Sequence, residues 1–401
     1  MNSFTAAGGE VTAVYSLRGA TIGEFKNTIL ETFFDDELSR KVTSVELALG
    51  EKPFPDHSVT LAHSGISEDV VVLAVLSKRT AECHCKEDAP IDLFDPGRLV
   101  LLNIPDGTTE IPNDAFSDCQ SVVGVTIPDS VTNIGARAFA NCCSLIWLTI
   151  PDSVAKIGLL AFSRCSSLTS LTIPESVEEV GNSSFYGCSS LTSLSIPASV
   201  KRIGNFSFSD CRSLTGLTIP ESVEVIGDKS FCGCSSLTSL TIPASVKMIG
   251  DSSFCGCSSL TSLTIPESLR EIEPGSFSGC SSLTGLTIPA SVREIGNNSF
   301  YGCSSLTSLT MSASVMEIGN YAFYGCCSLT SLTIPASVNK IGKSSFHGCS
   351  SLTSLTIPES VEVIGDVAFS GCSSLTSLTI PESVKKIGRG AFEGCIAVLE
   401  Q

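Results

Sequence analysis

Cysteine is the residue of this sequence with the widest chemical repertoire, because a thiolate serves as nucleophile, disulfide partner or metal ligand. The chain has 401 residues and 19 cysteines. Thirteen of them stand 23 residues apart: Cys119, Cys142, Cys165, Cys188, Cys211, Cys234, Cys257, Cys280, Cys303, Cys326, Cys349, Cys372 and Cys395. A repeated structural unit requires such regular spacing, whereas a disulfide framework does not. We therefore predict that these cysteines form a buried row of small hydrophobic side chains.

Two further cysteines lie outside this row. Cys232 and Cys255 occupy the same position in neighbouring repeats, beside Cys234 and Cys257 of the row. Four sulfurs at one place could form a Cys₄ zinc site. The C-x-C spacing is tighter than the usual C-x₂-C, and two of the four belong to the buried row. The main alternative is therefore a pair of exposed thiols that oxidise together.

Other residue types give little support for catalysis. The chain has four histidines, one of them in Cys83-His84-Cys85, which is a weaker metal-site candidate still. Serine is abundant through repetition, so a Ser/His/Asp coincidence carries no weight. The sequence has no phosphate-binding loop and no dinucleotide fingerprint. We predict that the protein is not an enzyme and uses no metal or other cofactor.

The elements that position these residues follow from the repeat. From about Gly97 onward the unit reads C-S-S-L-T-S-L-T-I-P-x-S-V-x-x-I-G-x-x-S-F-x-G. The alternation in Leu171-Thr172-Ile173 predicts a short β-strand with its apolar side chains inward, which Pro174 ends. Gly187 and its equivalents precede the row cysteines and favour a left-handed turn. For residues 176–185 a short helix and an irregular segment both stay open.

The pattern L-x-x-L-x-I-P-x-x-V-x-x-I-G-x-x-A/S-F-x-x-C resembles the BspA-like class of leucine-rich repeats. Pairs such as Ala115-Phe116 and Ala138-Phe139 are typical of that class. The resemblance covers residues 97–401 and implies a leucine-rich-repeat solenoid of about thirteen 23-residue coils, with a parallel β-sheet on its concave face. It also implies a non-enzymatic scaffold or adaptor that binds a protein partner.

Two places depart from the repeat. Glu273-Pro274 replaces the usual Gly and its neighbour, so we expect a different local backbone there. The last unit stops at Glu400-Gln401 without a polar capping repeat. We therefore expect the final coil to fray or to be covered by a partner, including a second copy in end-to-end association.

The first ninety-six residues lack the repeat. Asn2–Ala6 and Val11–Leu17 can form a hairpin, and Thr21 with Glu24 forms a capping box for a helix. Val45–Gly50 and Val70–Leu76 predict two later strands. This β-β-α-β-β order resembles ubiquitin-like (β-grasp) domains, which predicts a small α+β domain over residues 1–80, a linker over 81–96 and the solenoid over 97–401.

The charge balance excludes several classes of partner. The chain has 41 acidic and 24 basic residues, a net charge of −17. No cluster of Lys and Arg offers a stripe for phosphates, so we expect no nucleic-acid partner. No run of 18 apolar residues occurs, and we expect no membrane insertion. The N-terminus has no secretory signal pattern, which predicts a cytoplasmic or otherwise intracellular protein.

The predicted sheet offers one face for binding, since the residues that flank each inward leucine point outward. Together they form two files of hydroxyl side chains: Ser170, Thr172, Ser193, Ser195, Thr218, Ser239, Thr241, Ser262, Thr264, Thr287, Ser308 and Thr310. We predict that a protein partner binds this face, and the alternative is a periodic surface such as a glycan or ice. Trp147 breaks the serine file and is either an anchor for the partner or packed against a neighbouring coil.

Overall fold

A computed structural model describes residues 98–396 of the chain, together with the strands below that lie before and after this range. It describes no α-helix within these segments. The triplet Cys83-His84-Cys85 and the predicted helix that begins near Thr21 lie outside the described residues. The chain divides into two compact units, Met1–Val177 and Glu178–Gln401. This boundary falls inside the repeats, and the predicted division at residues 80 and 97 stays a prediction.

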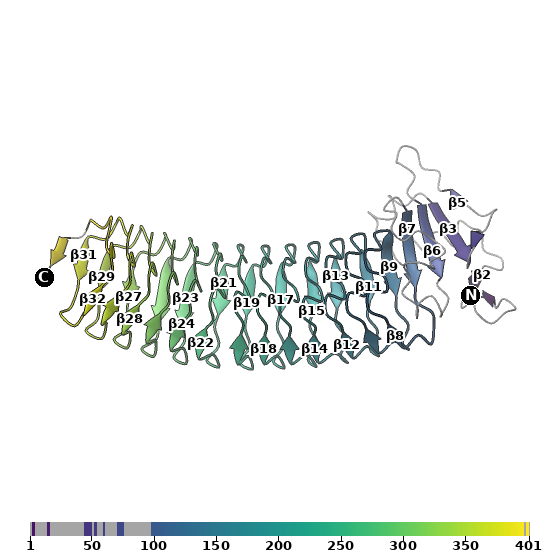
Figure 1. Ribbon diagram of the computed structural model, residues 1–401, viewed down its shortest axis with the longest axis horizontal. Coiled ribbons are helices and arrows are strands. Elements are labelled where there is room, and N and C mark those ends of the chain that lie inside the picture. Colours follow the sequence, from purple (N-terminus) through teal and green to yellow (C-terminus); the bar gives the residue numbers. More distant parts are fainter. Residues whose placement is uncertain are drawn as a thin grey trace. The chain divides into compact units, whose positions relative to one another are not determined.

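The first unit contains thirteen described strands in chain order (Figure 1). They are β1 (Asn2–Phe4), β2 (Val14–Ser16), β3 (Ser44–Leu49), β4 (Lys52–Pro53), β5 (Val59–Thr60), β6 (Val70–Val75), β7 (Arg98–Asn103), β8 (Glu110–Ile111), β9 (Val122–Thr126), β10 (Asn133–Ile134), β11 (Trp147–Thr149), β12 (Lys156–Ile157) and β13 (Ser170–Thr172). The largest sheet has the order β11-β9-β7-β6-β3-β4, with β5 also paired to β3.

The early strands bear on the predicted N-terminal domain. β1 and β2 pair antiparallel, which confirms the predicted hairpin. β3 and β6 are strands as expected; they pair parallel to each other, and β6 pairs parallel to β7. Residues 70–75 thus belong to the same sheet as the repeat strands β9 and β11. The ubiquitin-like identity of residues 1–80 stays a prediction, because most of that range lies outside the described residues.

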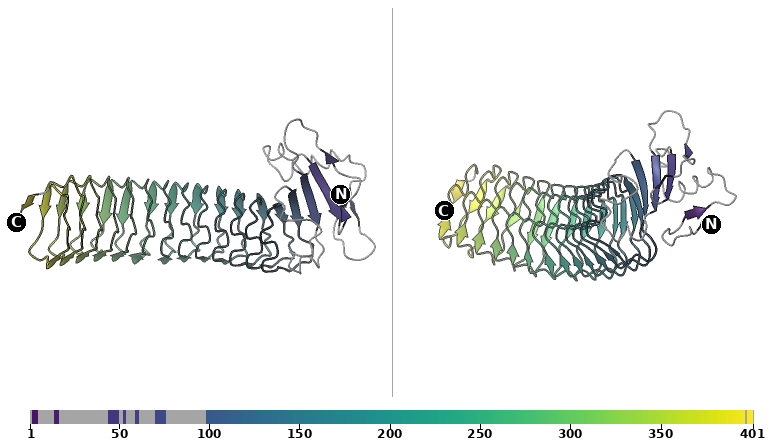
Figure 2. Two further views of the ribbon diagram at one scale, coloured as in Figure 1. Left: turned by 45° about the horizontal axis from the view of Figure 1, so that its top comes forward. Right: turned by 45° about the vertical axis from the view of Figure 1, so that its right-hand side comes forward.

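In the second unit, long and short strands alternate along the chain. The odd-numbered strands are β15 (Ser193–Ser195), β17 (Gly216–Thr218), β19 (Ser239–Thr241), β21 (Ser262–Thr264), β23 (Gly285–Ile288), β25 (Ser308–Met311), β27 (Leu332–Thr333), β29 (Ser354–Thr356), β31 (Ser377–Thr379) and β33 (Val398–Glu400). The even-numbered strands are β14 (Glu179–Val180), β16 (Arg202–Ile203), β18 (Val225–Ile226), β20 (Met248–Ile249), β22 (Glu271–Ile272), β24 (Glu294–Ile295), β26 (Glu317–Ile318), β28 (Lys340–Ile341), β30 (Val363–Ile364) and β32 (Lys386–Ile387). In Figure 2 the odd- and even-numbered strands of this unit run along opposite sides of the stacked coils. The pairing within each series is parallel, so this unit is a parallel β-solenoid.

Each coil has the strand and the left-handed turn that its repeat sequence predicts. In β19, Leu240 points inward while Ser239 and Thr241 are exposed. Gly233, before the row cysteine, has φ of +78°, and Asp210 adopts the same left-handed conformation in the preceding coil with φ of +61°. The segment between the proline and the phenylalanine, left open by the sequence, consists of turns around the short even-numbered strand. Of the two conformations that the sequence left open for residues 176–185, the short helix is not present.

The core of the coils is a stack of phenylalanines. In the second unit the rings of Phe185 through Phe369 are fully buried, at no more than 1% exposure. Consecutive rings lie face to face, as for Phe254 and Phe277 with centroids 5.6 Å apart and planes 2° apart. Burial of one such side chain contributes about 2–3 kcal/mol. Since each ring is covered by the coils on both sides, one coil alone lacks its core.

The row cysteines lie beside this stack, as predicted. They are free and, apart from half-buried Cys395, buried. Each described thiol of the row in the second unit from Cys211 onward donates a weak hydrogen bond to the phenylalanine carbonyl of the preceding coil, such as Cys234 Sγ to Phe208 O at 3.4 Å. Burial raises the pKa of the Cys234 thiol to about 12. The buried cysteines of the row are therefore structural and unreactive at neutral pH.

The departure at Glu273-Pro274 does alter the backbone. At the usual glycine position a Cβ collides with the preceding coil, and at Gly296 the carbonyl oxygen of Ile272 would lie 2.4 Å from it. Glu273 carries such a Cβ, so its coil cannot stack as closely. Accordingly the even-numbered strands divide there, with β14-β16-β18-β20 in one sheet and β22 onward in another.

Candidate binding surfaces

The first candidate surface is the predicted hydroxyl face on the odd-numbered strands. Its residues are exposed in both units, considered separately: Ser170 and Thr172 in the first, and Ser193, Ser195, Thr218, Ser239, Thr241, Ser262, Thr264, Thr287, Ser308 and Thr310 in the second. Within β17-β19-β21 they are in register, as Thr218, Thr241 and Thr264. The exposure of these files confirms their predicted orientation, while their role in binding stays a prediction.

A third hydroxyl file borders this face and was not singled out from the sequence. It is formed by the threonine before each strand, from Thr215 to Thr376 in the second unit. From Thr238 onward each Oγ1 donates to the carbonyl oxygen of the threonine one coil earlier, as Thr261 does to Thr238 at 3.0 Å and Thr307 to Thr284 at 2.9 Å. These hydroxyls help to hold the coils together. Only the repetition of Thr at that position could have suggested this role.

The hydroxyl face is less continuous than the repeat suggests. In the second unit its strands fall into separate hydrogen-bonded groups, including β17-β19-β21, β23-β25 and β27-β29-β31-β33. Gly216 and Gly285 also leave the serine file without a hydroxyl at two coils. A periodic ligand requires unbroken spacing, so both features weaken the match to a regular lattice.

Trp147 packs against its neighbour, which is the second of its two predicted roles. It is half-buried and pairs with Gly124 of the adjacent strand. A Cβ at Gly124 would lie 2.2 Å from Cε2 of the indole, so the ring covers the space left by the missing side chain. A residue with a side chain at position 124 would collide with the indole of Trp147, so this position requires glycine. An anchoring role for Trp147 in partner binding stays a prediction.

The opposite face, on the even-numbered strands, carries charge. Lys201 and Lys247 form exposed ion pairs with Glu178 and Glu224 of the preceding coil, at 3.4 and 2.7 Å. The Lys247 ammonium accordingly lowers the pKa of Glu224, first through its hydrogen bond and then through its charge. Coils that contain PASVK carry a lysine where coils that contain PESVE carry a glutamate, so opposite charges pair between neighbouring coils. Each exposed pair contributes little to stability.

A third surface lies at the turns, where one position varies while its neighbours repeat. We call the residues that follow the stacked phenylalanines the post-phenylalanine column. In the second unit its members are Tyr186, Ser209, Cys232, Cys255, Ser278, Tyr301, Tyr324, His347, Ser370 and Glu393. The glycine or aspartate after each member donates its N–H to the carbonyl oxygen of the next one, as Gly302 does to Tyr324 at 2.7 Å. The backbone thereby fixes diverse side chains at regular steps.

Three consecutive members of this column form an aromatic ladder. Tyr301 and Tyr324 stack with ring centroids 4.8 Å apart, and Tyr324 and His347 stack at 4.7 Å. Tyr301 is 40% exposed and the other two rings are half-buried. Tyr321 leans against Tyr324 at 6.1 Å, and the Lys343 ammonium lies 5.9 Å from its ring centroid.

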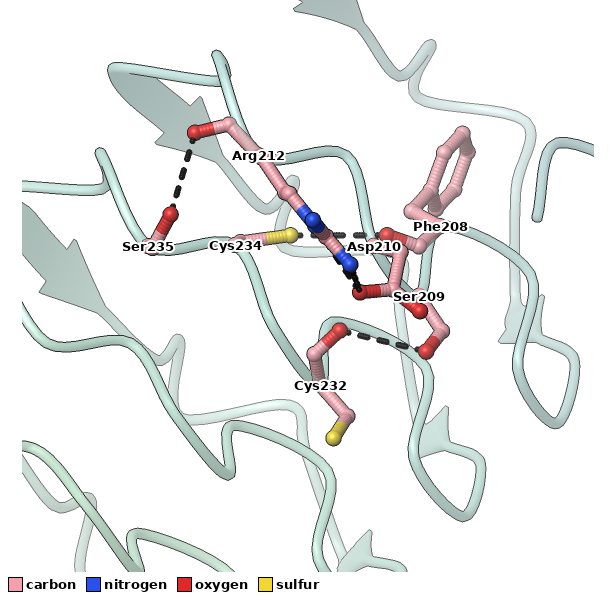
Figure 3. Close-up of polar contacts among 7 residues, drawn as sticks. All are labelled: Phe208, Ser209, Asp210, Arg212, Cys232, Cys234 and Ser235. Carbon is pink, nitrogen blue, oxygen red and sulfur yellow. Dashed lines mark hydrogen bonds and ion pairs between the residues drawn. The ribbon is translucent and has the colours of Figure 1, made fainter. Parts of the chain in front are cut away.

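The cysteines of the column do not form the four-sulfur site considered above. Figure 3 shows the sulfur of Cys234 directed at the Phe208 carbonyl and the sulfur of Cys232 turned away from it. Cys257 likewise donates inward, to Phe231 O at 3.5 Å. The four thiols are therefore divided between core and surface. No group of three or more His, Cys, Asp or Glu side chains in the described segments is arranged to hold a metal.

In the part of the chain that the structure describes, no helix has the length and hydrophobicity required to span a bilayer. The predicted intracellular location stays a prediction.

Comparison with known proteins places the repeats in a family. The BspA type leucine rich repeat region matches residues 92–215, 178–292 and 270–398. A leucine-rich repeat protein from Bacteroides ovatus has a solved structure similar to this one, with 33% identity and a TM-score of 0.63 over 74% of this chain and 85% of that one. A leucine-rich repeat protein from Eubacterium ventriosum is 25% identical, with a TM-score of 0.52 over 74% of this chain and 82% of the other. A search of curated proteins found no match. The fold and the matched repeats together show that the chain belongs to the BspA-type leucine-rich repeat family.

Proposed function

We propose that this protein is a non-enzymatic scaffold that binds another protein through exposed side chains of its repeat coils. The observation that carries the proposal is the aromatic ladder of Tyr301, Tyr324 and His347. Tyrosine is enriched at the energetic centres of protein interfaces, whereas Ser and Thr are poor anchors. The ladder thus provides an anchor that the hydroxyl face of the second unit lacks.

The ladder is also ordered before a partner arrives. Each ring is stacked on the next, and the backbone beneath is held by the bonds from Gly302 to Tyr324 and from Gly325 to His347, at 2.7 and 2.8 Å. Stacked rings lose little rotamer freedom on binding, and that loss is a main cost of forming an interface. Pre-ordering therefore favours the bound state.

The charge of the chain indicates which partners the ladder suits. With a net charge of −17, the protein attracts basic surfaces. The Lys343 ammonium above the Tyr321 ring shows the same preference within the molecule, since cations lie favourably over aromatic faces. A partner that presents arginine or an apolar side chain to the ladder fits best.

The experiment uses the full chain and substitutions that the repeat already accepts. Ser209 and Ser278 occupy the same column, so Tyr301→Ser with Tyr324→Ser preserves the coil. Proteins captured by the wild type are identified, and the binding of one purified candidate is measured to wild type and variant. We expect the double variant to lose at least about tenfold in affinity, since truncation of a hot-spot residue costs about 2 kcal/mol or more and tenfold is about 1.4 kcal/mol. Unchanged affinity in a folded double variant would contradict the proposal.

A second candidate function rests on the exposed hydroxyl files. In-register hydroxyls at about 4.8 Å steps suit a repetitive ligand such as a glycan or ice. Thr241→Val with Thr264→Val removes hydroxyls from one group of strands and leaves the ladder intact. If this variant loses polysaccharide binding or ice-growth inhibition that the wild type shows, the hydroxyl face is the functional one.

A further inference from the structure

Two adjacent members of the post-phenylalanine column are thiols in contact. Cys232 and Cys255 lie in neighbouring coils, and their backbones are fixed by bonds from Asp210 N to Cys232 O at 2.7 Å and from Gly233 N to Cys255 O at 2.6 Å. Both side chains are half-buried, and the Cys232 thiol donates a hydrogen bond to the Cys255 sulfur. Equivalent atoms of stacked strands are about 4.8 Å apart, within the Cα separation of about 4.4–6.8 Å that a disulfide requires.

Other described cysteines lack this combination of access and partner. The row thiols of the second unit are buried apart from Cys395, whose neighbour Cys372 is itself buried. Cys327 is exposed, but the equivalent positions of the coils on either side hold Ser304 and Ser350. Cys232 and Cys255 are thus a pair in which both members are reachable from solvent.

The surroundings divide the two thiols into a nucleophile and a proton donor. The hydrogen bond from Cys232 lowers the pKa of Cys255 to about 6, against the opposing effect of burial, with further help from the Ser278 hydroxyl and the Lys229 ammonium. The same contact and burial raise the pKa of Cys232. Neutral solution therefore holds a thiolate at Cys255 beside a thiol at Cys232, as in reactive dithiols.

We propose that Cys232 and Cys255 are a modification site at which peroxides form a reversible disulfide between neighbouring coils. The Cys255 sulfur attacks one peroxide oxygen, the O–O bond breaks, and the leaving hydroxide takes a proton to become water. The Cys232 sulfur then displaces hydroxide from the resulting sulfenic acid, and its own proton completes the second water. Two thiols and one hydrogen peroxide thus give one disulfide and two waters, and a dithiol reductant reverses the bond. The proposal is independent of the binding function above.

The test uses the full chain, reduced and then treated with one equivalent of hydrogen peroxide at pH 7. Free thiols are alkylated and the digested protein is analysed by mass spectrometry. We expect a peptide pair joined through Cys232 and Cys255 and lighter by two hydrogens, formed at least about tenfold faster than oxidation of Cys327. Iodoacetamide labelling of Cys255 should rise with pH around a midpoint near 6.

Substitutions to serine supply matched controls, because Ser209 and Ser278 occupy the same column. Cys232→Ser should leave a Cys255 sulfenic acid that dimedone traps, and Cys327→Ser should leave the disulfide unchanged. If folded wild type gives no joined peptide, or if Cys327 oxidises while Cys232 and Cys255 remain thiols, the proposal is wrong.

Discussion

Several residues of this solenoid have left-handed backbone conformations that residues with a Cβ disfavour. The position two before each buried phenylalanine is left-handed throughout, with occupants that range from Gly275 at φ of +65° to Val367 at +48°. A β-branched residue at positive φ is a true outlier, because its side chain crowds the backbone. The coil geometry overrides local preference there, and the repeat letters alone did not reveal this second left-handed position.

Val367→Asn should stabilise the protein. Asn298 occupies the same position in another coil at φ of +56°, and asparagine tolerates this region at lower cost. We expect the free energy of unfolding to rise by about 1 kcal/mol, measured by chemical denaturation. The same change at Val363, a strand residue of the same coil, should lower stability. A loss at both positions would contradict the strain argument.

Glu273 gives the stability a specific pH dependence. Burial, followed by the charges of Glu271 and Asp251, raises its pKa from 4.5 to about 7. The folded state therefore keeps a proton that the unfolded state has lost, and stability falls as pH rises from about 4.5 to about 7.

Glu273→Gln should remove this fall. We expect the variant to exceed the wild type at pH 8 by on the order of 1 kcal/mol, since solvent screens a partly exposed group. At pH 4 the two proteins should be equally stable, because Glu273 is protonated in both states there. Parallel denaturation curves at the two pH values test this. If the variant exceeds the wild type in stability by the same amount at pH 4 and pH 8, the cause is packing and not the titration of Glu273.

At the scale of elements, the coil that contains Glu273 and Pro274 divides the even-numbered strands of the second unit. The Cβ of Glu273 stands where neighbouring coils have glycine, and Pro274 has no N–H to donate. Gly296-Asn297 and Gly319-Asn320 show the pair that other coils use.

Glu273→Gly with Pro274→Asn should therefore rejoin the two sheets. We expect slower hydrogen exchange at Met248–Ile249 and Glu271–Ile272, together with a higher melting temperature. Hydrogen-exchange mass spectrometry provides the measurement, and Gly296→Glu is the matched opposite change, expected to open a second break. Unchanged exchange in the first variant would show that Glu273 and Pro274 do not cause the division.

The elements were predictable to the extent that their residues repeat. The strand at Leu171, the buried phenylalanines and the cysteine row follow from a fixed 23-residue period, since identical units can bury only identical positions. The short even-numbered strands were not predictable, because two residues such as Lys340-Ile341 give too little pattern. Their pairing comes from stacking, a property of neighbouring coils that no single unit contains.

At the scale of the whole molecule, uniform positions build the solenoid and varied ones carry its chemistry. The hydroxyl files were readable from the sequence because they repeat. The aromatic ladder was missed since Tyr301, Tyr324 and His347 lie 23 residues apart in a column that otherwise holds serine, cysteine, glutamate and the separate Tyr186. Only the stacked coils bring the centroid of each ring within 5 Å of the next.

A direct test of binding through the aromatic ladder is the dissociation constant of one purified protein partner, measured for the wild type, for the ladder variant Tyr301→Ser/Tyr324→Ser and for the hydroxyl-face variant Thr241→Val/Thr264→Val. We expect the dissociation constant to rise at least about tenfold for the ladder variant and to change little for the hydroxyl-face variant, with both proteins folded. The reverse order would contradict binding through the ladder and place the binding surface on the strands.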